Sequence, residues 1–465
     1  MKSGIALLSA LILAAGPGLA GEQTVAANGR AALAVTVYGN GLALIKETRK
    51  ATLTKGRNVL AIEGVGTSMI PESVSLSADG TTVVERNFEF DLLTPEAILK
   101  RSVGRKVGIV RTHPTTGEES IERATVLSVA GGVVLKAADG KILTGVPGRL
   151  VFDQLPEGLR AKPTLLATVE VGIAGKKNIN LHYLTGNMSW HADYTLTIAD
   201  DEKAFDLEGW ATITNTSGAE YRDATLKLIA GDVRRQSRPQ GMVDKVAEGM
   251  MMARAAPADA PRQETMGDVH LYTVTGEVTL RERETKQVAL LTRNDVKMNR
   301  RYTVQSGYGF GRIGDTPPVN PSVSLMFENK GKGAEPLPQG IVRTYRRDKS
   351  GAVQFAGEAM LRHTPVGEKV ELPLGRAFDI TVRRTQTEFV RLTQPKAGFE
   401  AAFKIAINNA KEEAATIHIV EAIPGDWQIV EESQPHAKDA RQATWAIAVP
   451  AKGKAELGYR VRVKQ

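Results

Sequence analysis

The segment Tyr194-Thr-Leu196-Thr-Ile198 alternates large apolar side chains with threonine, and this two-residue period decides the fold class. Segments such as Leu33-Ala-Val35-Thr-Val37 and Tyr459-Arg-Val461-Arg-Val463 repeat the pattern roughly every ten residues. Turn signals such as Asp139-Gly140 separate them. The sequence therefore predicts an all-β protein of tandem, immunoglobulin-like β-sandwich domains, with an N-terminal β unit and a small SH3-like barrel.

Composition narrows the class of protein. The chain has 465 residues and no cysteine, and 60 Lys and Arg against 52 Asp and Glu give a formal charge of +8. This length predicts about two to four domains. The lack of cysteine excludes disulfides, thiolate metal sites and cysteine nucleophiles. The basic clusters are not interleaved with aromatic residues, so we expect no nucleic-acid partner.

The first twenty residues have the pattern of a secretory signal peptide. Lys2 precedes an apolar run over residues 5–15, and Gly18-Leu19-Ala20 supplies small residues for a cleavage site after Ala20. The run is closer to about 11 residues than to the ~20 that span a bilayer, and no later stretch is long and apolar enough. We expect a secreted or periplasmic protein without a transmembrane segment.

Shifts in composition predict the domain boundaries. After the signal peptide at 1–20 we expect an N-terminal β domain over 21–102, a barrel-like domain over 103–158, a central β-sandwich region over 159–235 and 268–392, and a C-terminal immunoglobulin-like sandwich over 393–465. Residues 236–267 are a flexible insertion that contains Met250, Met251 and Met252. Methionine thioethers can bind Cu(I), but bunched methionines in an alanine-rich stretch more often form a plastic contact surface.

Two local signals predict smaller structures. Thr94, Pro95 and Glu96 suit the start of a short helix that runs to about residue 101. A pattern of apolar-x-apolar-x-Asn ends at Asn215, Asn329 and Asn409, and an asparagine that closes a strand can satisfy the backbone of the following turn.

One group of residues could bind a metal ion. If Gly186-Asn187 forms a two-residue hairpin loop, His182 lies opposite His191, and Asp193 lies on the same face. Two imidazoles and a carboxylate could hold Zn²⁺ or Cu²⁺. The alternative is a pair of half-exposed cross-strand histidines, with Asp193 bonded to a backbone amide. Apart from this possible divalent metal we expect no cofactor.

The familiar catalytic signatures fail. Gly309-Phe-Gly311-Arg-Ile-Gly314 matches the dinucleotide-binding pattern, but Pro317-Pro318 cannot continue the helix which that pattern requires. The sequence contains no G-x-S-x-G, no H-E-x-x-H and no P-loop motif. Enzymatic activity stays open, and a non-enzymatic role is favoured.

An ordered series of motifs carries a family resemblance. It comprises Ser189-Trp190-His-Ala-Asp193-Tyr194, Gly209-Trp210-Ala-Thr-Ile213-Thr-Asn215, Pro336-Leu-Pro338-x-Gly340-x-Val342-x-x-Tyr345 and Gly375-x-Ala377-Phe378-Asp379. Over roughly residues 165–465 the chain resembles the bacterial family called domain of unknown function 4139, which includes mucoidy-inhibitor-A-like envelope proteins.

The resemblance implies a secreted or periplasmic β-rich protein without an established activity, and it transfers no catalytic residue. The mucoidy-inhibitor name implies a link to capsule or exopolysaccharide, although those relatives carry a long N-terminal coiled coil that this chain lacks. Trp190, Tyr194, Trp210 and Tyr345 are motif residues that could serve interaction, and buried core positions explain the tryptophans better than a sugar-stacking platform does.

The sequence thus predicts an exported, non-enzymatic β-sandwich protein that makes protein or polysaccharide contacts in the bacterial cell envelope. The alternative is a metal- or carboxylate-dependent hydrolase that acts on envelope polymer. Grouping of His182, His191 and Asp193 at one surface would favour the hydrolase, and dispersal would favour the binding module. The sequence defines no oligomeric state.

Overall fold

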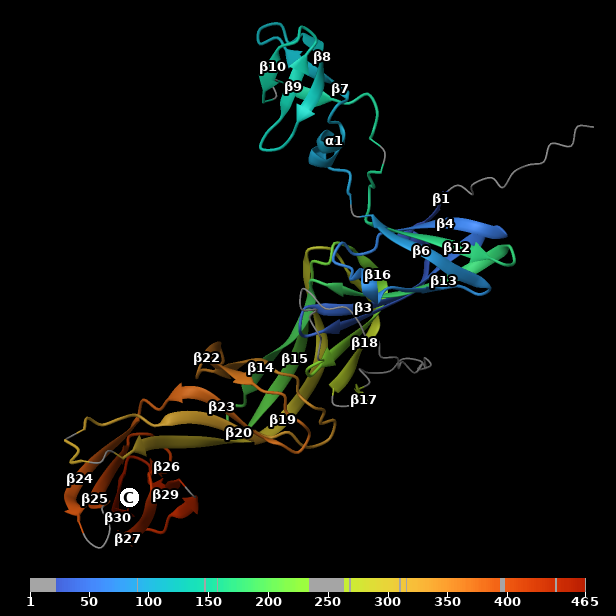
Figure 1. The fold of residues 1–465 in the computed structure, drawn as a ribbon. Helices are drawn as coiled ribbons and strands as arrows, with labels where there is room; N and C mark the ends of the chain where they lie inside the picture. The colour runs from blue at the N-terminus through green and yellow to red at the C-terminus, as the bar shows by residue number, and fades with distance from the viewer. Residues whose placement is uncertain are drawn as a thin grey trace, which may run out of the picture.

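A computed structural model describes residues 22–89, 91–145, 148–156, 158–233, 263–266, 269–308, 311–314, 316–393, 398–439 and 441–464. The predicted signal peptide and Met250, Met251 and Met252 lie outside the described residues. Figure 1 shows β units arranged in one elongated molecule, with the C-terminal unit at one end. In the described part of the chain, no helix has the length and hydropathy needed to cross a membrane.

Strands dominate the described chain, which is an all-β, multi-sheet fold as predicted. Its α-helix, α1 (Pro95–Arg101), begins where the sequence predicts, because the Thr94 side chain accepts a hydrogen bond of 3.1 Å from the Ala97 amide. Two short 3-10 helices, η1 (Ala27–Gly29) and η2 (Pro71–Ser73), connect strands.

The N-terminal strands form two sheets. The four-stranded sheet has the order β1 (Glu22–Val25), β4 (Gly56–Glu63), β12 (Thr164–Val171), β6 (Thr81–Glu89). The seven-stranded sheet has the order β17 (Gln263–Met266), β18 (Val269–Leu280), β16 (Tyr221–Ala230), β2 (Arg30–Tyr38), β3 (Leu42–Leu53), β13 (Gly175–Gly186), β5 (Ser75–Ser77).

These sheets cross the predicted boundaries. β2 pairs in parallel with β16, and β3 pairs with β13, so the strands of residues 21–102 are completed by strands more than a hundred residues later. β17 lies within the predicted insertion at 236–267. Alternation defines which face of a strand is buried but not which strand is its partner, and this is why the boundaries differ.

The small domain is inserted between β6 and β12. It forms a five-stranded sheet with the order β10 (Ile142–Thr144), β9 (Val134–Ala137), β8 (Glu119–Ser128), β7 (Lys106–Thr112), β11 (Arg149–Val151). A separate core that includes Val107, Ile109 and Leu135 stabilises it. Within the described residues, β10 and β11 do not pair, so the predicted barrel is an open sheet. In Figure 1 this unit projects from the rest of the molecule.

The remaining strands form a ten-stranded sheet and a four-stranded sheet. The main path of the larger sheet is β22 (Val353–Leu361), β21 (Gly340–Arg347), β14 (Met188–Ile198), β15 (Ala204–Asn215), β19 (Glu284–Gly307), β26 (Ala415–Ala422), β29 (Gln442–Val449), β28 (Ala437–Asp439). Off this path, β20 (Ser322–Glu328) pairs with β19 and with β23 (Lys369–Arg376). The four-stranded sheet has the order β24 (Ile380–Leu392), β25 (Gly398–Asn409), β30 (Lys454–Lys464), β27 (Asp426–Glu432).

The 24-residue strand β19 joins the central region to the C-terminal sandwich. Its first part pairs with β15, and its end pairs in parallel with β26. Tyr302 and Val304 thereby enter the C-terminal core, which also contains Trp427 and Trp445. β24 contributes to this core although it precedes the predicted boundary at residue 393.

The three strand-ending asparagines close turns, as predicted. Asn215 donates to the carbonyl of Ala219 at 2.9 Å, and Asn409 donates to the carbonyl of Glu413 at 2.9 Å. Asn329 donates to the carbonyl of Glu335 at 3.0 Å. All three side chains are buried, and each also donates to a carbonyl at the end of a neighbouring strand or turn. The recurring asparagine therefore stabilises the conformation of the loop that follows each strand.

Replacing Asn409 with alanine is expected to destabilise the C-terminal sandwich by about 1–3 kcal/mol, because the carbonyls of Glu413 and Pro450 lose their buried donor. Hydrogen exchange of peptides from β25 and β26, read by mass spectrometry, measures the change. The matched control is Asn408→Ala, an exposed neighbour, which should shift stability by less than about 0.5 kcal/mol. Equal effects of the two changes would contradict the proposed role of Asn409.

Candidate functional site

Gly186-Asn187 does not form the two-residue hairpin loop on which the metal-site hypothesis depends. β13 pairs with β3 and β5, whereas β14 pairs with β15 and β21, so His182 and His191 belong to different sheets. A turn does form here, and Asn187 has a φ of 57°, a left-handed conformation that asparagine tolerates. The turn carries the chain from one sheet to the other, and the Gly186 amide donates to the carbonyl of Ser68.

His191 and Asp193 do lie together. The His191 Nε2 atom is 3.2 Å from Asp193 Oδ2, Arg343 Nη1 is 3.0 Å from Oδ1, and the Thr212 hydroxyl donates to Oδ2 at 2.6 Å. Burial acts to raise the pKa of Asp193, but the bonds from Thr212 and Arg343 and the charge of His191 hold it below its usual value. His182 is not part of this network. Among the described residues, no group of three or more His, Asp or Glu side chains is placed to hold a metal ion.

The aromatic motif residues differ in exposure. Trp190 and Tyr194 are buried, and their polar atoms donate to the carbonyls of Ile229 at 3.0 Å and Pro338 at 2.7 Å. Tyr345 packs edge-on against Phe355. Trp210 is 37% exposed. Trp190 therefore ties β14 to β16 of the other sheet, which is a structural role.

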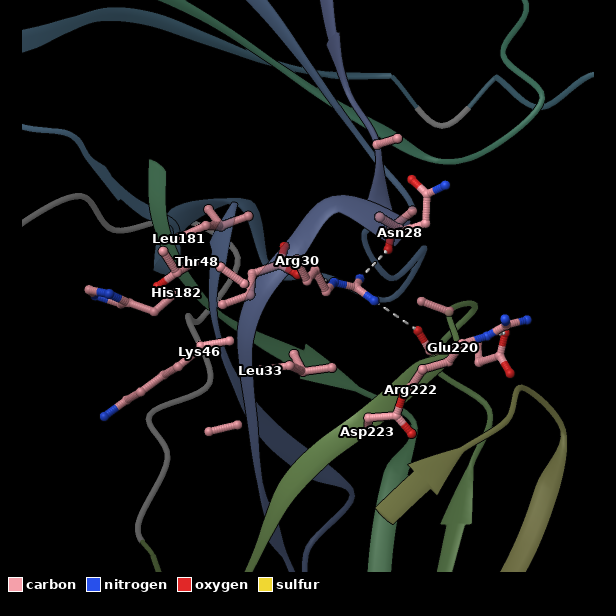
Figure 2. Close-up of a pocket in the computed structure, with 18 of the residues that line it drawn as sticks. Asn28, Arg30, Leu33, Lys46, Thr48, Leu181, His182, Glu220, Arg222 and Asp223 are labelled. Carbon is pink, nitrogen blue, oxygen red and sulfur yellow. Dashed lines mark hydrogen bonds and ion pairs between the residues drawn. The ribbon is translucent and has the colours of Figure 1, made fainter. Parts of the chain in front are cut away.

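A trough of about 1180 Å³ lies on the outer face of the seven-stranded sheet. Small outward-facing side chains of β2 and β16 form its floor, namely Ala32, Ala34 and Thr225. In Figure 2, Lys46 and His182 lie on one side of β2, and Glu220, Arg222 and Asp223 lie on the other.

The sheet register aligns five exposed or half-exposed residues across the trough. Glu277 pairs with Thr225, Thr225 with Ala34, Ala34 with Lys46, and Lys46 with His182. Three strand spacings of about 4.8 Å put the backbones of Glu277 and Lys46 about 14 Å apart. Because Ala34 and Thr225 are small, two walls face each other across an open floor. We call them the basic wall, with Lys46 and His182, and the acidic wall, with Glu220, Asp223, Glu277 and Glu282.

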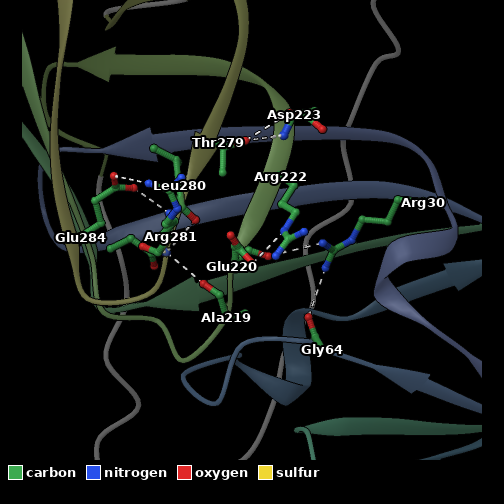
Figure 3. Close-up of polar contacts among 11 residues, drawn as sticks. Arg30, Gly64, Ala219, Glu220, Arg222, Asp223, Thr279, Leu280, Arg281 and Glu284 are labelled. Atoms are coloured by element: carbon green, nitrogen blue, oxygen red, sulfur yellow. Dashed lines mark hydrogen bonds and ion pairs between the residues drawn. The ribbon is translucent and has the colours of Figure 1, made fainter.

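Arg30 closes one end of the trough. Its Nη2 donates to the carbonyl of Gly64 at 3.1 Å and its Nη1 to that of Glu220 at 3.4 Å, as Figure 3 shows. Its Nε donates to the buried carboxylate of Glu47. Glu47 also pairs with Arg49, at 2.7 Å. This end of the trough is therefore rigid.

Hydrogen bonds hold the acidic wall in place (Figure 3). Arg222 Nε lies 2.9 Å from the Glu220 carboxylate. Asp223 has a φ of 50° beside a bulge in β16, and its carboxylate accepts a bond of 3.1 Å from Thr279. The Glu282 carboxylate accepts a bond of 2.8 Å from the Gly218 amide. The Glu277 carboxylate has no hydrogen-bond or ion-pair partner in the described part of the chain.

The basic wall offers unpaired charge. Lys46 is exposed, and its ammonium group has no hydrogen-bond or ion-pair partner among the described residues. The same holds for Lys162, which lines the trough near the end that Arg30 closes. Burial, and next the charge of Lys46, lower the pKa of the His182 imidazole below its usual value. No aromatic residue is among the described residues that line the trough. The site can therefore pair charges of both signs, but it lacks a stacking surface.

Sequence reasoning missed the trough. A signal was present in Arg30-Ala-Ala-Leu-Ala-Val35, where alanines occupy outward positions at which an exposed strand normally carries larger polar residues. The two walls could not be predicted from the sequence, because they come from β3, β13, β16 and β18, whose pairing the sequence does not specify.

A family model described as Domain of unknown function (DUF4139) matches residues 179–465, which is more than half of the chain. A comparison with curated proteins gave no match. The matched range includes His182 and the acidic wall, whereas the floor on β2 and the lysine on β3 precede it.

Proposed function

The chain belongs to the DUF4139 family, and from its trough we propose that it is an exported, non-enzymatic binding protein of the cell envelope that holds an extended segment of a partner protein. The predicted signal peptide supports export. The observation that carries the proposal is the aligned row from Glu277 to His182, in which opposite charges flank a floor of small residues.

An extended polypeptide fits these walls. Successive side chains of a strand point to opposite sides, so a segment that lies along β2 can direct acidic residues toward Lys46 and basic residues toward Glu277. The unpaired charges on both walls would then gain partners, and charge pattern would select the segment.

The other two candidate functions have less support. Recognition of neutral sugars generally uses an aromatic platform, and the described lining of the trough contains none. A hydrolase needs acid, base or metal ligands that converge on one point. The separation of His182 from the His191 and Asp193 pair favours the binding module.

The test is a selection of displayed peptides, beside a glycan array, with the mature chain of residues 21–465. We expect the selected peptides to contain both acidic and basic residues. Ala34→Trp, which fills the floor, should weaken their binding at least about tenfold, as should Lys46→Glu. The control is Thr52→Trp on β3, an exposed position outside the trough.

Binding that is unchanged in Ala34→Trp and Lys46→Glu would overturn the proposal. Enrichment of glycans without peptides would also overturn it and would favour a polysaccharide ligand.

A further inference from the structure

A second concave surface, on the ten-stranded sheet, is strongly basic. It is a groove of about 940 Å³ between the turn that follows β14, strand β19, the end of β20 and the start of β23. We call it the lysine groove, after the cationic residues that line it: Lys203, Lys297, Lys330, Lys332 and Lys369, together with Arg293. Two acidic residues, Asp295 and Glu328, are the described carboxylates of its lining.

Three of the lysines carry charge that no described residue neutralises. Lys297 pairs with Asp295 and Lys330 with Glu328, each at 2.7 Å. The ammonium groups of Lys203, Lys332 and Lys369 have no hydrogen-bond or ion-pair partner among the residues that the structure describes. A concave surface with unbalanced charge of one sign concentrates ions of the other sign.

The Arg293 guanidinium stabilises the fold and is not free to bind a ligand. Its Nη1 donates to Asn329 Oδ1 at 2.6 Å, its Nη2 donates to the carbonyl of Lys330 at 2.6 Å, and it is 9% exposed. The free cations of the groove are therefore lysines, which act as point charges and lack the planar fork with which arginine recognises one anion in a fixed geometry.

The loop Lys330-Gly-Lys332-Gly333 is a longer version of the turns that the strand-ending asparagines close. Asn215 and Asn409 close their turns on the carbonyl four residues later, whereas Asn329 closes on Glu335, six residues later. The longer turn contains both glycines, which have φ values of 112° and 72°, and both lysines. The asparagine and Arg293 thus hold an extended basic loop at the edge of the groove.

We propose that the lysine groove binds a linear polysaccharide that carries carboxylate groups. A protein interface would need an apolar centre, but Val296, Met298 and Phe327 are buried, and Met326 is the one half-exposed large apolar side chain of the described lining. Phe327 is also too buried to stack on a nucleic-acid base. Binding of a repeating anionic polymer requires only several unneutralised point charges along an open groove. The lysine groove supplies these charges. This site and ligand differ from those of the proposed function.

The probe is a fluorescein-labelled oligogalacturonate, followed by fluorescence anisotropy with the mature chain. We expect it to bind at about 50 mM salt and to bind more weakly at about 300 mM, while its neutral methyl ester does not bind. Lys330→Glu with Lys332→Glu should weaken binding at least about tenfold. The control, Lys454→Glu with Lys464→Glu, makes the same change in net charge on exposed residues of β30 and should alter binding less than about twofold.

Three results would overturn the inference: no binding of the oligogalacturonate, equal losses in the two double variants, or equal binding of the methyl ester. Tighter binding of single-stranded DNA than of the oligogalacturonate would replace the polysaccharide by a nucleic acid. Ala34→Trp in the trough should leave oligogalacturonate binding unchanged, which distinguishes failure of this inference from failure of the proposed function.

Discussion

Replacing Glu47 with alanine is expected to lower the stability of the N-terminal sheets by about 3–5 kcal/mol. The Glu47 carboxylate is buried between Arg30 and Arg49 and forms an ion pair with each of them. Arg49 is 1% exposed, and burial lowers its pKa although the charge of Glu47 acts in the opposite direction. Without Glu47, two guanidinium groups share a site that no described carboxylate neutralises.

The carbonyls around Arg49 do not remove this penalty. Its Nη1 donates to Val25 at 2.8 Å and to Glu63 at 2.6 Å, and these bonds supply dipoles but no negative charge. An uncompensated buried charge is among the few single changes that cost several kcal/mol. Because Arg30 also closes the trough, Glu47→Ala should weaken binding of the selected peptides as well.

Hydrogen exchange of peptides from β3 and β13, read by mass spectrometry, measures the loss of stability in this part of the molecule. The control is Glu85→Ala, which breaks an exposed pair with Arg57 at 4.0 Å and should change stability by less than about 1 kcal/mol. If the two changes increase exchange by the same amount, Glu47 does not neutralise a buried charge.

The sequence predicts the buried faces of strands, the helix cap and the turns better than it predicts which strands pair with each other. Alternation gives the strands, and the capping signals at Thr94 and at the three asparagines are local, because the groups that bond lie within a few residues. Gly186-Asn187 shows the limit. The left-handed turn forms, but a turn signal does not tell a hairpin from a crossing between sheets.

Both candidate sites depend on pairing between distant strands. The trough exists because Ala34 lies between Thr225 and Lys46, which are separated by about 180 residues of sequence. The lysine groove is partly visible in Lys330-Gly-Lys332-Gly333, but a short run of lysines alone reads as a solvated loop. The structure places Lys203 and Lys369 in the lining of the same groove, and only this arrangement indicates a cationic binding surface.

In the C-terminal sandwich, breaking the ion pair between Arg384 and Glu421 is expected to cost about 3–5 kcal/mol, whereas replacing both partners costs much less. Arg384 lies on β24 and Glu421 on β26, so the pair links the two sheets of the sandwich. Two hydrogen bonds of 2.9 and 3.1 Å join the guanidinium to the fully buried carboxylate. The guanidinium carbon lies 3.8 Å from the centroid of the Phe403 ring.

Three variants separate the pair from its surroundings. Glu421→Leu leaves a buried cation, and Arg384→Met leaves a buried carboxylate, so each single change should be strongly destabilising. In the double variant no buried charge remains, and apolar side chains of similar length fill the space beside Phe403, so most of the stability should return. Hydrogen exchange of peptides from β29 and β30, read by mass spectrometry, reports the opening of this sandwich, since the Trp445 ring on β29 stacks 4.7 Å from that of Tyr459 on β30, a neighbour of the pair. A double variant that is as unstable as the sum of the single ones would contradict charge compensation and assign the cost to lost packing on Phe403.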